Sequence, residues 1–344
     1  MSFKRLDPED IVISADGVSS PCWTGNVVTL TAFYTSSDQA NGISGDYYLN
    51  VYQTTPPSGS EESNAAIQFS IAYGHVAGSG SADLNTQVDG YSPSKIVYGQ
   101  YRTLINGTEE ENLSFAGTTP DSIYAISVQR ARYKEKLFPG SLTLRLETTT
   151  GAVSLTDNSN QISTETFSDI GRIYNLISGS SGVKTSSPLD SASLGYTPSY
   201  GSYGLFLPDA GLILLNGDAL DQGLAGGGIA LGTGTANSDQ ENPQKLLNAL
   251  NDGEVFTLRS EETVSSNYVF VRARNNEFNY STNPSNITGS GELRHSIMID
   301  TPQAYATAVG LYNDNNDLLA VAKLSRPLLK DFTKEALIRI KLDY

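Results

Sequence analysis

Cysteine and histidine are nearly missing from this sequence of 344 residues, which has only Cys22, His75 and His295. A single cysteine excludes an intrachain disulfide framework and any metal site built from several cysteines. The sequence also has no Gly-x-Ser-x-Gly elbow, no His-Glu-x-x-His pair and no phosphate-binding P-loop. We therefore expect no catalytic residue, no cofactor, no metal and no small-molecule substrate.

His75 ends a predicted strand, at a position where its side chain could act as a general base. No second histidine or paired motif accompanies it, so a structural hydrogen-bonding role is the better interpretation. Acidic residues are numerous, and a β-sheet hydrolase or lyase with a carboxylate pair stays open as a minor alternative. No residue of the sequence singles out such a pair.

Positive charge is also scarce, since 22 Lys and Arg face 37 Asp and Glu for a net charge of -15. A nucleic-acid groove needs a basic footprint, so we expect no nucleic-acid partner. The one basic cluster, residues 130–136, is better interpreted as a solvated turn or a contact with an acidic neighbour. No apolar run approaches the roughly 20 residues of a membrane span, so we expect no membrane partner. No signal peptide is visible, so we expect the chain to assemble in a cytoplasm.

Short alternating runs are what the sequence does contain. In 336–344, alanine, isoleucine, leucine and tyrosine alternate with leucine, arginine, lysine and aspartate, which indicates a half-buried strand. Similar patterns predict strands at 11–14, 27–34, 47–52, 67–73, 96–105, 122–129, 141–147, 305–312 and 318–324, and a further β-like run within 268–284. Apolar runs also occur at 205–207 and 212–215. The predicted fold is mainly β, with antiparallel, β-sandwich-like sheets, long loops and one or two short helices.

Composition suggests three parts. We expect a β-rich domain at 1–150, a connecting region rich in serine, threonine and glycine at 151–202, and a second β-rich domain at 203–344. The second domain holds the one clear helix, 243–251, with Pro243 in its first turn and Gly253 past its end. Residues 54–64 and 74–94 are predicted to be exposed loops, and whether they order only on assembly is left open.

A hairpin is predicted near the end of the sequence. Strands at 305–312 and 318–324 flank Asn313-Asp-Asn-Asn-Asp317. This run is similar to the start of a calcium-binding loop, but the required glycine and later glutamate are absent. Asn and Asp tolerate left-handed backbone geometry, so a hairpin connection is the better interpretation.

Several segments resemble virion structural proteins of T4-like contractile-tailed phages of the cyanophage type. They are Ile-Ala-Tyr-Gly-His at 71–75, Tyr-Gly-Gln-Tyr-Arg at 98–102, Tyr-Gly-Leu-Phe-Leu-Pro-Asp at 203–209, the stretch 269–284, and the hairpin 309–323. The hairpin also resembles one common in tail-fibre and tail-collar proteins, which often carry a glycine in the turn where this chain has Asn316. The resemblance implies a non-enzymatic component of a virion, placed in the tail, the baseplate region or the neck.

The partners implied are other virion structural proteins and further copies of this chain, in a particle assembled in the host cytoplasm. The alternative is a fibre-like adhesin that binds the host surface or its glycans. Trp23 is predicted to be a core or interface anchor. The candidate interaction residues are Tyr312, Asn313, Asp314, Asn315, Asn316, Asp317, Arg272, Arg274, Trp23 and Tyr344.

Overall fold

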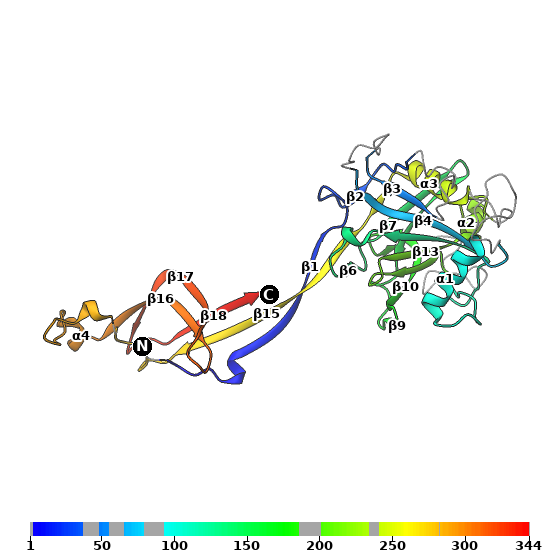
Figure 1. Ribbon diagram of the computed structural model, residues 1–344. Helices are drawn as coiled ribbons and strands as arrows, with labels where there is room; N and C mark the ends of the chain where they lie inside the picture. Colours follow the sequence, from blue (N-terminus) through cyan, green and yellow to red (C-terminus); the bar gives the residue numbers. More distant parts are fainter. Residues whose placement is uncertain are drawn as a thin grey trace. The chain divides into compact units, whose positions relative to one another are not determined.

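A computed structural model describes residues 3–36, 48–54, 65–78, 93–185, 201–233, 241–281 and 283–343 (Figure 1). Strands make up 46% of it and helices 16%, so the predicted mainly β fold with antiparallel sheets is confirmed. The chain divides into two compact units. Unit 1 combines Met1–Gly17 with Thr263–Tyr344, and unit 2 is Val18–Glu262.

Unit 2 is built on one large curled sheet whose neighbouring strands are antiparallel. Its strand order is β2-β14-β7-β8-β10-β12-β13-β5-β4-β3, and the short strands β9 and β11 also pair with β10. The strands are β2 (Thr29–Leu30), β3 (Leu49–Tyr52), β4 (Ile67–His75), β5 (Ser122–Val128), β7 (Thr143–Thr148), β8 (Gly151–Asp157), β9 (Thr166–Ser168), β10 (Gly171–Ser180), β11 (Val183–Lys184), β12 (Gly204–Leu207), β13 (Leu212–Asn216) and β14 (Phe256–Thr257).

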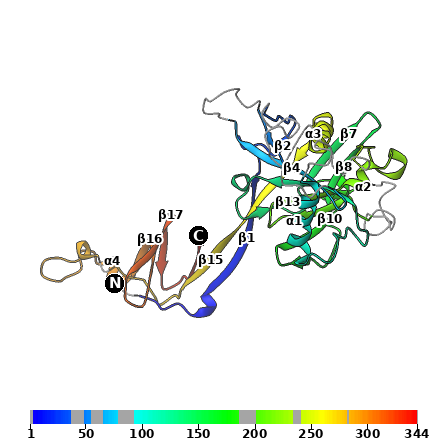
Figure 2. The same ribbon diagram turned by 45° about the vertical axis from the view of Figure 1, so that its right-hand side comes forward.

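Both faces of this sheet are covered. Along β5, Tyr124 and Ile126 belong to one hydrophobic cluster, whereas Ile123 and Ala125 belong to another, as alternation along a strand requires. Side chains of α2 (Gly217–Asp221) and α3 (Asn242–Gly253) join the first cluster. Side chains of α1 (Ser94–Asn106) join the second. Helices α1 and α3 lie beside the strands of unit 2 in the ribbon of Figure 2.

The predicted helix at 243–251 is confirmed as α3, which begins with Asn242 and Pro243 and ends at Gly253. Leu246, Leu247 and Leu250 form its buried stripe. At Gly253 the helix lies so close to β7 that an added Cβ would be 2.2 Å from the carbonyl oxygen of Arg145. The glycine is therefore needed for close packing. The left-handed residue at the end of the helix is Glu254, with a φ of 54°.

The strand predicted at 96–105 is wrong, because these residues form α1. Val97 and Tyr98 are buried, and Tyr101 and Ile105 pack partly buried against the same cluster. The spacing of these four side chains places them on one helical face. The β-branched and aromatic residues that favoured a strand are used here to cover the sheet, so tertiary packing outweighs local preference.

Trp23 lies in the first hydrophobic cluster and exposes only 2% of its surface. Its indole N–H donates to the Phe256 carbonyl oxygen at 3.0 Å, and the two rings meet edge to face at 4.8 Å between centroids. Phe69 completes this aromatic group, 6.1 Å from Trp23 and 5.1 Å from Phe256. Of the two predicted roles, core anchor and interface anchor, the structure shows the first.

The unit boundaries differ from the predicted domains 1–150, 151–202 and 203–344. Strands β7 and β8 pair across residue 150, from Leu144 with Leu155 to Thr148 with Gly151. Strands β8 and β10, inside the expected connecting region, belong to the large sheet. In the described part of that region, Ser181 and Gly182 form the turn between β10 and β11. Residues 186–200 lie outside the described residues.

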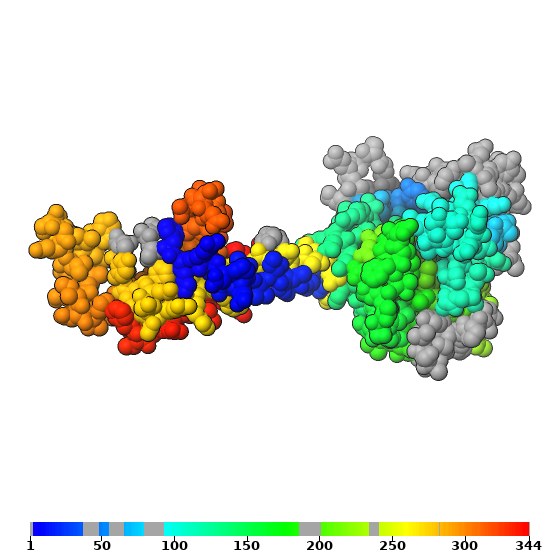
Figure 3. Space-filling view, turned by 90° about the horizontal axis from the view of Figure 1, so that it is seen from below, coloured from blue at the N-terminus to red at the C-terminus, as the bar shows by residue number. Residues whose placement is uncertain are grey.

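Unit 1 is made of long strands from both ends of the sequence. After η1 (Pro8–Asp10), β1 (Ile11–Pro21) pairs with β15 (Arg259–Ala273), which pairs with β18 (Ala336–Asp343). The β15–β18 register runs from Ser266 with Asp343 to Ala273 with Ala336. The blue amino-terminal segment lies along yellow β15 in Figure 3. The chain passes between the units within β1 and again within β15.

In unit 1, η5 (Pro284–Asn286) and α4 (Ile297–Asp300) precede a separate two-stranded sheet of β16 (Gln303–Tyr312) and β17 (Leu318–Asp331). In unit 2, η3 (Arg130–Arg132) and η4 (Leu224–Gly226) lie between strands, and β6 (Lys136–Leu137) pairs with the unit 2 end of β15. The described residues thus hold four α-helices, against one or two predicted.

Candidate interaction surface

Unit 1 buries very few side chains. Of its described residues, only Ser266, Val269, Asn279, Lys330, Ala336 and Ile340 are buried. Three of the six are polar, and neither hydrophobic cluster of the described chain contains a residue of unit 1. A unit of about 100 residues normally buries a continuous apolar core. Unit 1 therefore holds its strands together mainly by backbone pairing and polar contacts.

Its apolar side chains are instead exposed. Of the 24 exposed large apolar side chains in the described part of the chain, 16 lie in unit 1, although unit 1 is much the smaller unit. Unit 1 thus exposes a larger share of large apolar side chains than unit 2 does. The 16 residues are Phe3, Ile11, Val12, Ile13, Tyr280, Ile287, Leu293, Ile297, Ile299, Tyr305, Tyr312, Leu318, Leu319, Val321, Phe332 and Leu337.

A polar group links the three strands of the unit 1 sheet. The hydroxyl of Ser266 on β15 donates to Asp343 Oδ1 at 2.6 Å and to Asp16 Oδ2 at 3.4 Å. Lys341 lies 3.1 Å from Asp343 and 3.6 Å from Asp16. The Ser266 hydrogen bond, followed by the Lys341 contact, lowers the pKa of Asp343. These contacts join β1, β15 and β18 without any apolar core.

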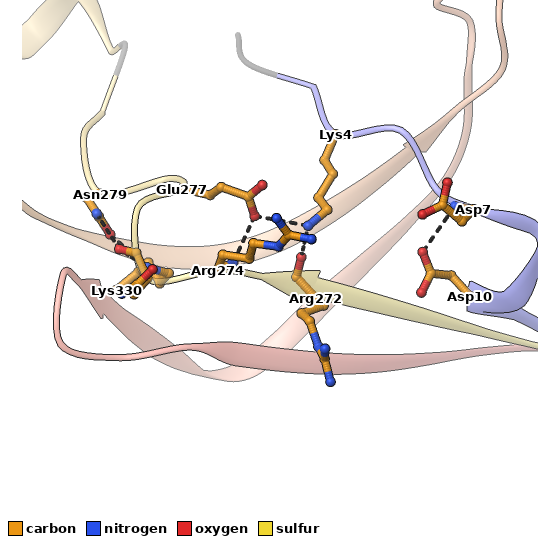
Figure 4. A network of polar contacts seen from close by, with 9 residues as sticks. Lys4, Asp7, Asp10, Arg272, Arg274, Glu277, Asn279 and Lys330 are labelled. Carbon is orange, nitrogen blue, oxygen red and sulfur yellow. Dashed lines mark hydrogen bonds and ion pairs between the residues drawn. The ribbon is translucent and has the colours of Figure 1, made fainter.

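Lys330 is a buried cation that fixes β17 to the segment after β15 (Figure 4). Its Nζ donates to the Asn279 side-chain oxygen at 2.8 Å and to the carbonyl oxygens of Asn275 and Asp331, both at 3.0 Å. Three acceptors match the three N–H groups of an ammonium. Because a buried ammonium needs every partner, the geometry ties the conformation of 275–279 to that of β17.

Lys4 makes a second tie between distant parts of unit 1 (Figure 4). Its Nζ donates to the Arg272 carbonyl oxygen at 2.6 Å and pairs with Glu277 Oε2 at 3.0 Å. The same carboxylate accepts the backbone N–H of Arg274 at 2.8 Å. This N–H and then Lys4 lower the pKa of Glu277. The amino-terminal segment is thereby held at the end of β15.

The predicted hairpin at 305–324 is confirmed by the β16–β17 pairing. In its turn, Asn313 Oδ1 accepts the backbone N–H groups of Asn315 and Asp317 at 3.0 and 2.8 Å. Asn316 has a φ of 64°, in the left-handed region. The Asn side chains thus build the turn as predicted from their backbone preferences.

The predicted interaction residues fall in three places. Tyr312 and the turn 313–317 lie at the tip of the hairpin, where the Tyr312 ring contacts Phe3 edge to face at 5.1 Å. Arg272 and Arg274 are exposed at the end of β15. Trp23 is in the core of unit 2 and takes no part in the surface. Tyr344 lies outside the described residues, and so do most of 54–64 and 74–94.

Structural contacts explain His75 in unit 2. The residue is 8% exposed, and its Nδ1 accepts the backbone N–H of Ala77 at 3.0 Å. Burial lowers the pKa of His75, and the negative charges of Asp121 and Asp218 raise it by a smaller amount. Asp218 is itself engaged by the backbone N–H and the hydroxyl of Ser122 at 3.2 and 2.7 Å. The predicted structural role is confirmed for the Nδ1 hydrogen bond.

The basic cluster 130–136 contacts acidic neighbours, as predicted. Lys134 pairs with Glu262, and Lys136 pairs with Glu261 at 3.5 Å. Arg130 donates to the Tyr133 carbonyl oxygen at 2.6 Å and lies over the ring of the same tyrosine. Lys134 and Lys136 are thus paired with acidic side chains of the same unit, whereas Arg130 contacts a carbonyl oxygen and an aromatic ring.

Two features of unit 1 could not be found from the sequence. Lys330 occupies an ordinary strand position among leucines, and no local pattern distinguishes it from an exposed lysine. Lys4 contacts residues more than 260 positions away.

Comparison of the chain with protein-family models, with curated proteins and with solved structures gives no match. Within the described ranges, no group of three or more His, Cys, Asp or Glu is placed to hold a metal ion. No helix of those ranges has the length and apolar character needed to cross a bilayer.

Proposed function

We propose that this chain is a non-enzymatic structural component of a bacteriophage virion, which assembles through protein–protein contacts into a contractile tail. The baseplate region is the first candidate for its place and the neck the second. Its partners are other virion structural proteins and further copies of the chain, in a particle assembled in the host cytoplasm. The sequence resemblance supplies the phage assignment.

The observation that carries the assembly role is the construction of unit 1. Unit 1 consists of long strands that expose 16 large apolar side chains, and only six of its described residues are buried. Most of its large apolar side chains therefore lie on the surface and not in a core. Contact with neighbouring subunits removes such surface from water, at roughly 25 cal/mol per Å² of apolar area. Strands with open edges can also extend a neighbour's sheet.

Purified particles of the phage that encodes the chain test this proposal. We expect mass spectrometry to find the chain at a fixed ratio to the major tail proteins. We also expect cryo-electron microscopy to place unit 1 against a neighbouring subunit. Infectious, complete particles that lack the chain would overturn the proposal.

A fibre-like adhesin is the second candidate, because Tyr280 and Tyr305 of unit 1 are each 62% exposed and sugars stack on exposed aromatic rings. Purified chain should then coat host cells saturably, and Tyr280→Ala with Tyr305→Ala should abolish the coating. Binding to cells in the absence of any virion partner distinguishes the adhesin from the assembly component. Failure to bind cells removes the adhesin.

A further inference from the structure

Strand β16 has one open edge along its whole length. On one side it pairs with β17, and no other described strand pairs with it. Its ten residues, Gln-Ala-Tyr-Ala-Thr-Ala-Val-Gly-Leu-Tyr, include no charged residue and no proline. Open edges present unpaired N–H and C=O groups, and proteins normally protect them with charges, prolines or bulges. The edge of β16 has none of these protections.

Strand β17 has all three protections: charged residues, a proline and bulges. Between the pairs Ala306–Leu328 and Ala308–Lys323, β17 advances five residues while β16 advances two, so β17 carries a bulge at 324–327. A second extra residue, Leu319, follows from the pairs Leu311–Ala320 and Tyr312–Leu318. The large bulge contains Arg326 and Pro327. Both irregularities fall on β17 and none on β16, so only the β16 edge suits pairing with another strand.

Charge indicates which strand can pair there. Unit 1 contains 11 Lys and Arg against 12 Asp and Glu, whereas unit 2 contains 11 against 25. Contacts between copies through unit 2 would therefore bring two strongly acidic units together. Contacts through unit 1 would not bring the acidic units together. Because β16 is uncharged, it can pair with a second β16 in any register without placing like charges opposite each other. The charge distribution thus favours a second copy, bound through the same strand.

We propose that the open edge of β16 pairs antiparallel with β16 of a second copy, an inference that rests on the proposed assembly function. A twofold contact of this kind is closed, because the same edge is used on both copies. It converts two two-stranded sheets, which are marginal alone, into one sheet of four strands. The outer edges of that sheet are the two β17 strands, which already carry the protections.

Two matched lysine substitutions test this pairing. Thr307 lies on β16 and Ser325 lies in the β17 bulge, and both are exposed. Thr307→Lys places a charge on the pairing edge of each copy, whereas Ser325→Lys adds the same charge to the same hairpin away from that edge. The masses of purified wild type and both variants are measured by sedimentation equilibrium over a range of concentrations.

We expect the wild type to associate, Thr307→Lys to lose at least about tenfold in association constant, and Ser325→Lys to stay within about twofold. Hydrogen exchange of β15 and β18 should be unchanged in Thr307→Lys, which shows that unit 1 is still folded. A monomeric wild type, or equal weakening by both substitutions, overturns the pairing. Absence of the chain from particles overturns the proposed function instead, so the two failures are distinguishable.

Discussion

Lys330 stabilises unit 1 through a single buried ammonium with three acceptors. Lys330→Met keeps an unbranched side chain of similar length but leaves the oxygens of Asn275, Asn279 and Asp331 without their donor. We expect a loss of about 3 kcal/mol in the free energy of unfolding unit 1, because buried unsatisfied acceptors are costly. Hydrogen exchange of β17 as a function of urea measures it.

Lys334→Met is the matched control for this substitution. The Lys334 side chain is 54% exposed and lies 3.6 Å from Asp331. An exposed ion pair of this kind contributes little, so we expect a change below about 0.5 kcal/mol. Equal stability of the two variants would show that the Lys330 contacts are dispensable.

Cys22 lies in the hydrophobic core of unit 2, so the reactivity of its thiol shows whether that core is folded. Burial raises the pKa of its thiol from 9.0 to about 12, and the charge of Arg132 offsets only part of the rise. Because the folded state keeps the thiol protonated, its contribution to stability is intact below pH 9.0 and is lost as the pH rises towards about 12. A buried protonated thiol is also a poor nucleophile.

We therefore expect Cys22 to react with a maleimide only after unfolding. Urea titrations at increasing pH should show that wild type loses stability faster above pH 9.0 than Cys22→Ala does. Rapid labelling of the folded chain, or identical pH dependence of the two proteins, would contradict a buried thiol.

Single residues were predictable where the backbone alone decides their role. The Asn313–Asp317 turn followed from the tolerance of Asn and Asp for left-handed geometry, and Asn316 adopts it. Trp23 was expected as a core or interface anchor, and its burial beside Phe256 decides between the two. The contacts of Lys330 and Lys4 depend on residues far along the chain, so no local pattern could reveal them.

Among the elements, strands such as β4 and β7 could be predicted from the sequence, whereas helix α1 could not. Along β4 and β7, Phe69, Ile71, Leu144 and Leu146 recur at every second position and pack in the first hydrophobic cluster, and a local pattern records such spacing directly. Helix α1 is rich in Ile, Val and Tyr, which favour strands, and its buried face becomes visible only once the sheet beneath it is known. The pattern of β8 was hidden by the turn residues around it.

The fit of α3 against β7 gives a prediction at the scale of elements. Gly253→Ala would place a Cβ 2.2 Å from the Arg145 carbonyl oxygen and push the helix off the strand. We expect a loss of about 1–3 kcal/mol in the free energy of unfolding, as for other overpacked sites. Denaturant titration of unit 2 measures it.

Gly223→Ala is the control, because a Cβ at Gly223 would meet nothing within 4 Å. We expect its stability to stay within about 0.5 kcal/mol of wild type. A Gly253→Ala protein as stable as this control would mean that α3 and β7 can separate at little cost.

At the scale of the whole molecule, charge is divided unequally between the units. Unit 2 carries 25 Asp and Glu against 11 Lys and Arg, so copies of the chain repel one another at low salt. We expect association to strengthen several-fold between about 0.02 and 0.5 M salt, as screening shortens the range of this repulsion. Sedimentation equilibrium measures it. Association that weakens with salt would point to ion pairs between copies as its cause.

The division into units could not be predicted from composition. Local shifts in serine, threonine and glycine content suggested boundaries near 150 and 203, but both positions fall between paired strands of unit 2. Unit 1 joins 3–17 to 263–343, and pairing over such a separation leaves no signal in any single segment.

This split arrangement sets an order of events during synthesis. Strand β1 leaves the ribosome early, but its partner β15 and the strands after it follow about 245 residues later, which takes roughly 10–50 s at ~5–20 residues per second. Unit 2 has all of its own strands before unit 1 can close. Under the proposed pairing, a nascent chain can present no finished β16 edge to a second copy until every residue of unit 2 has been synthesised.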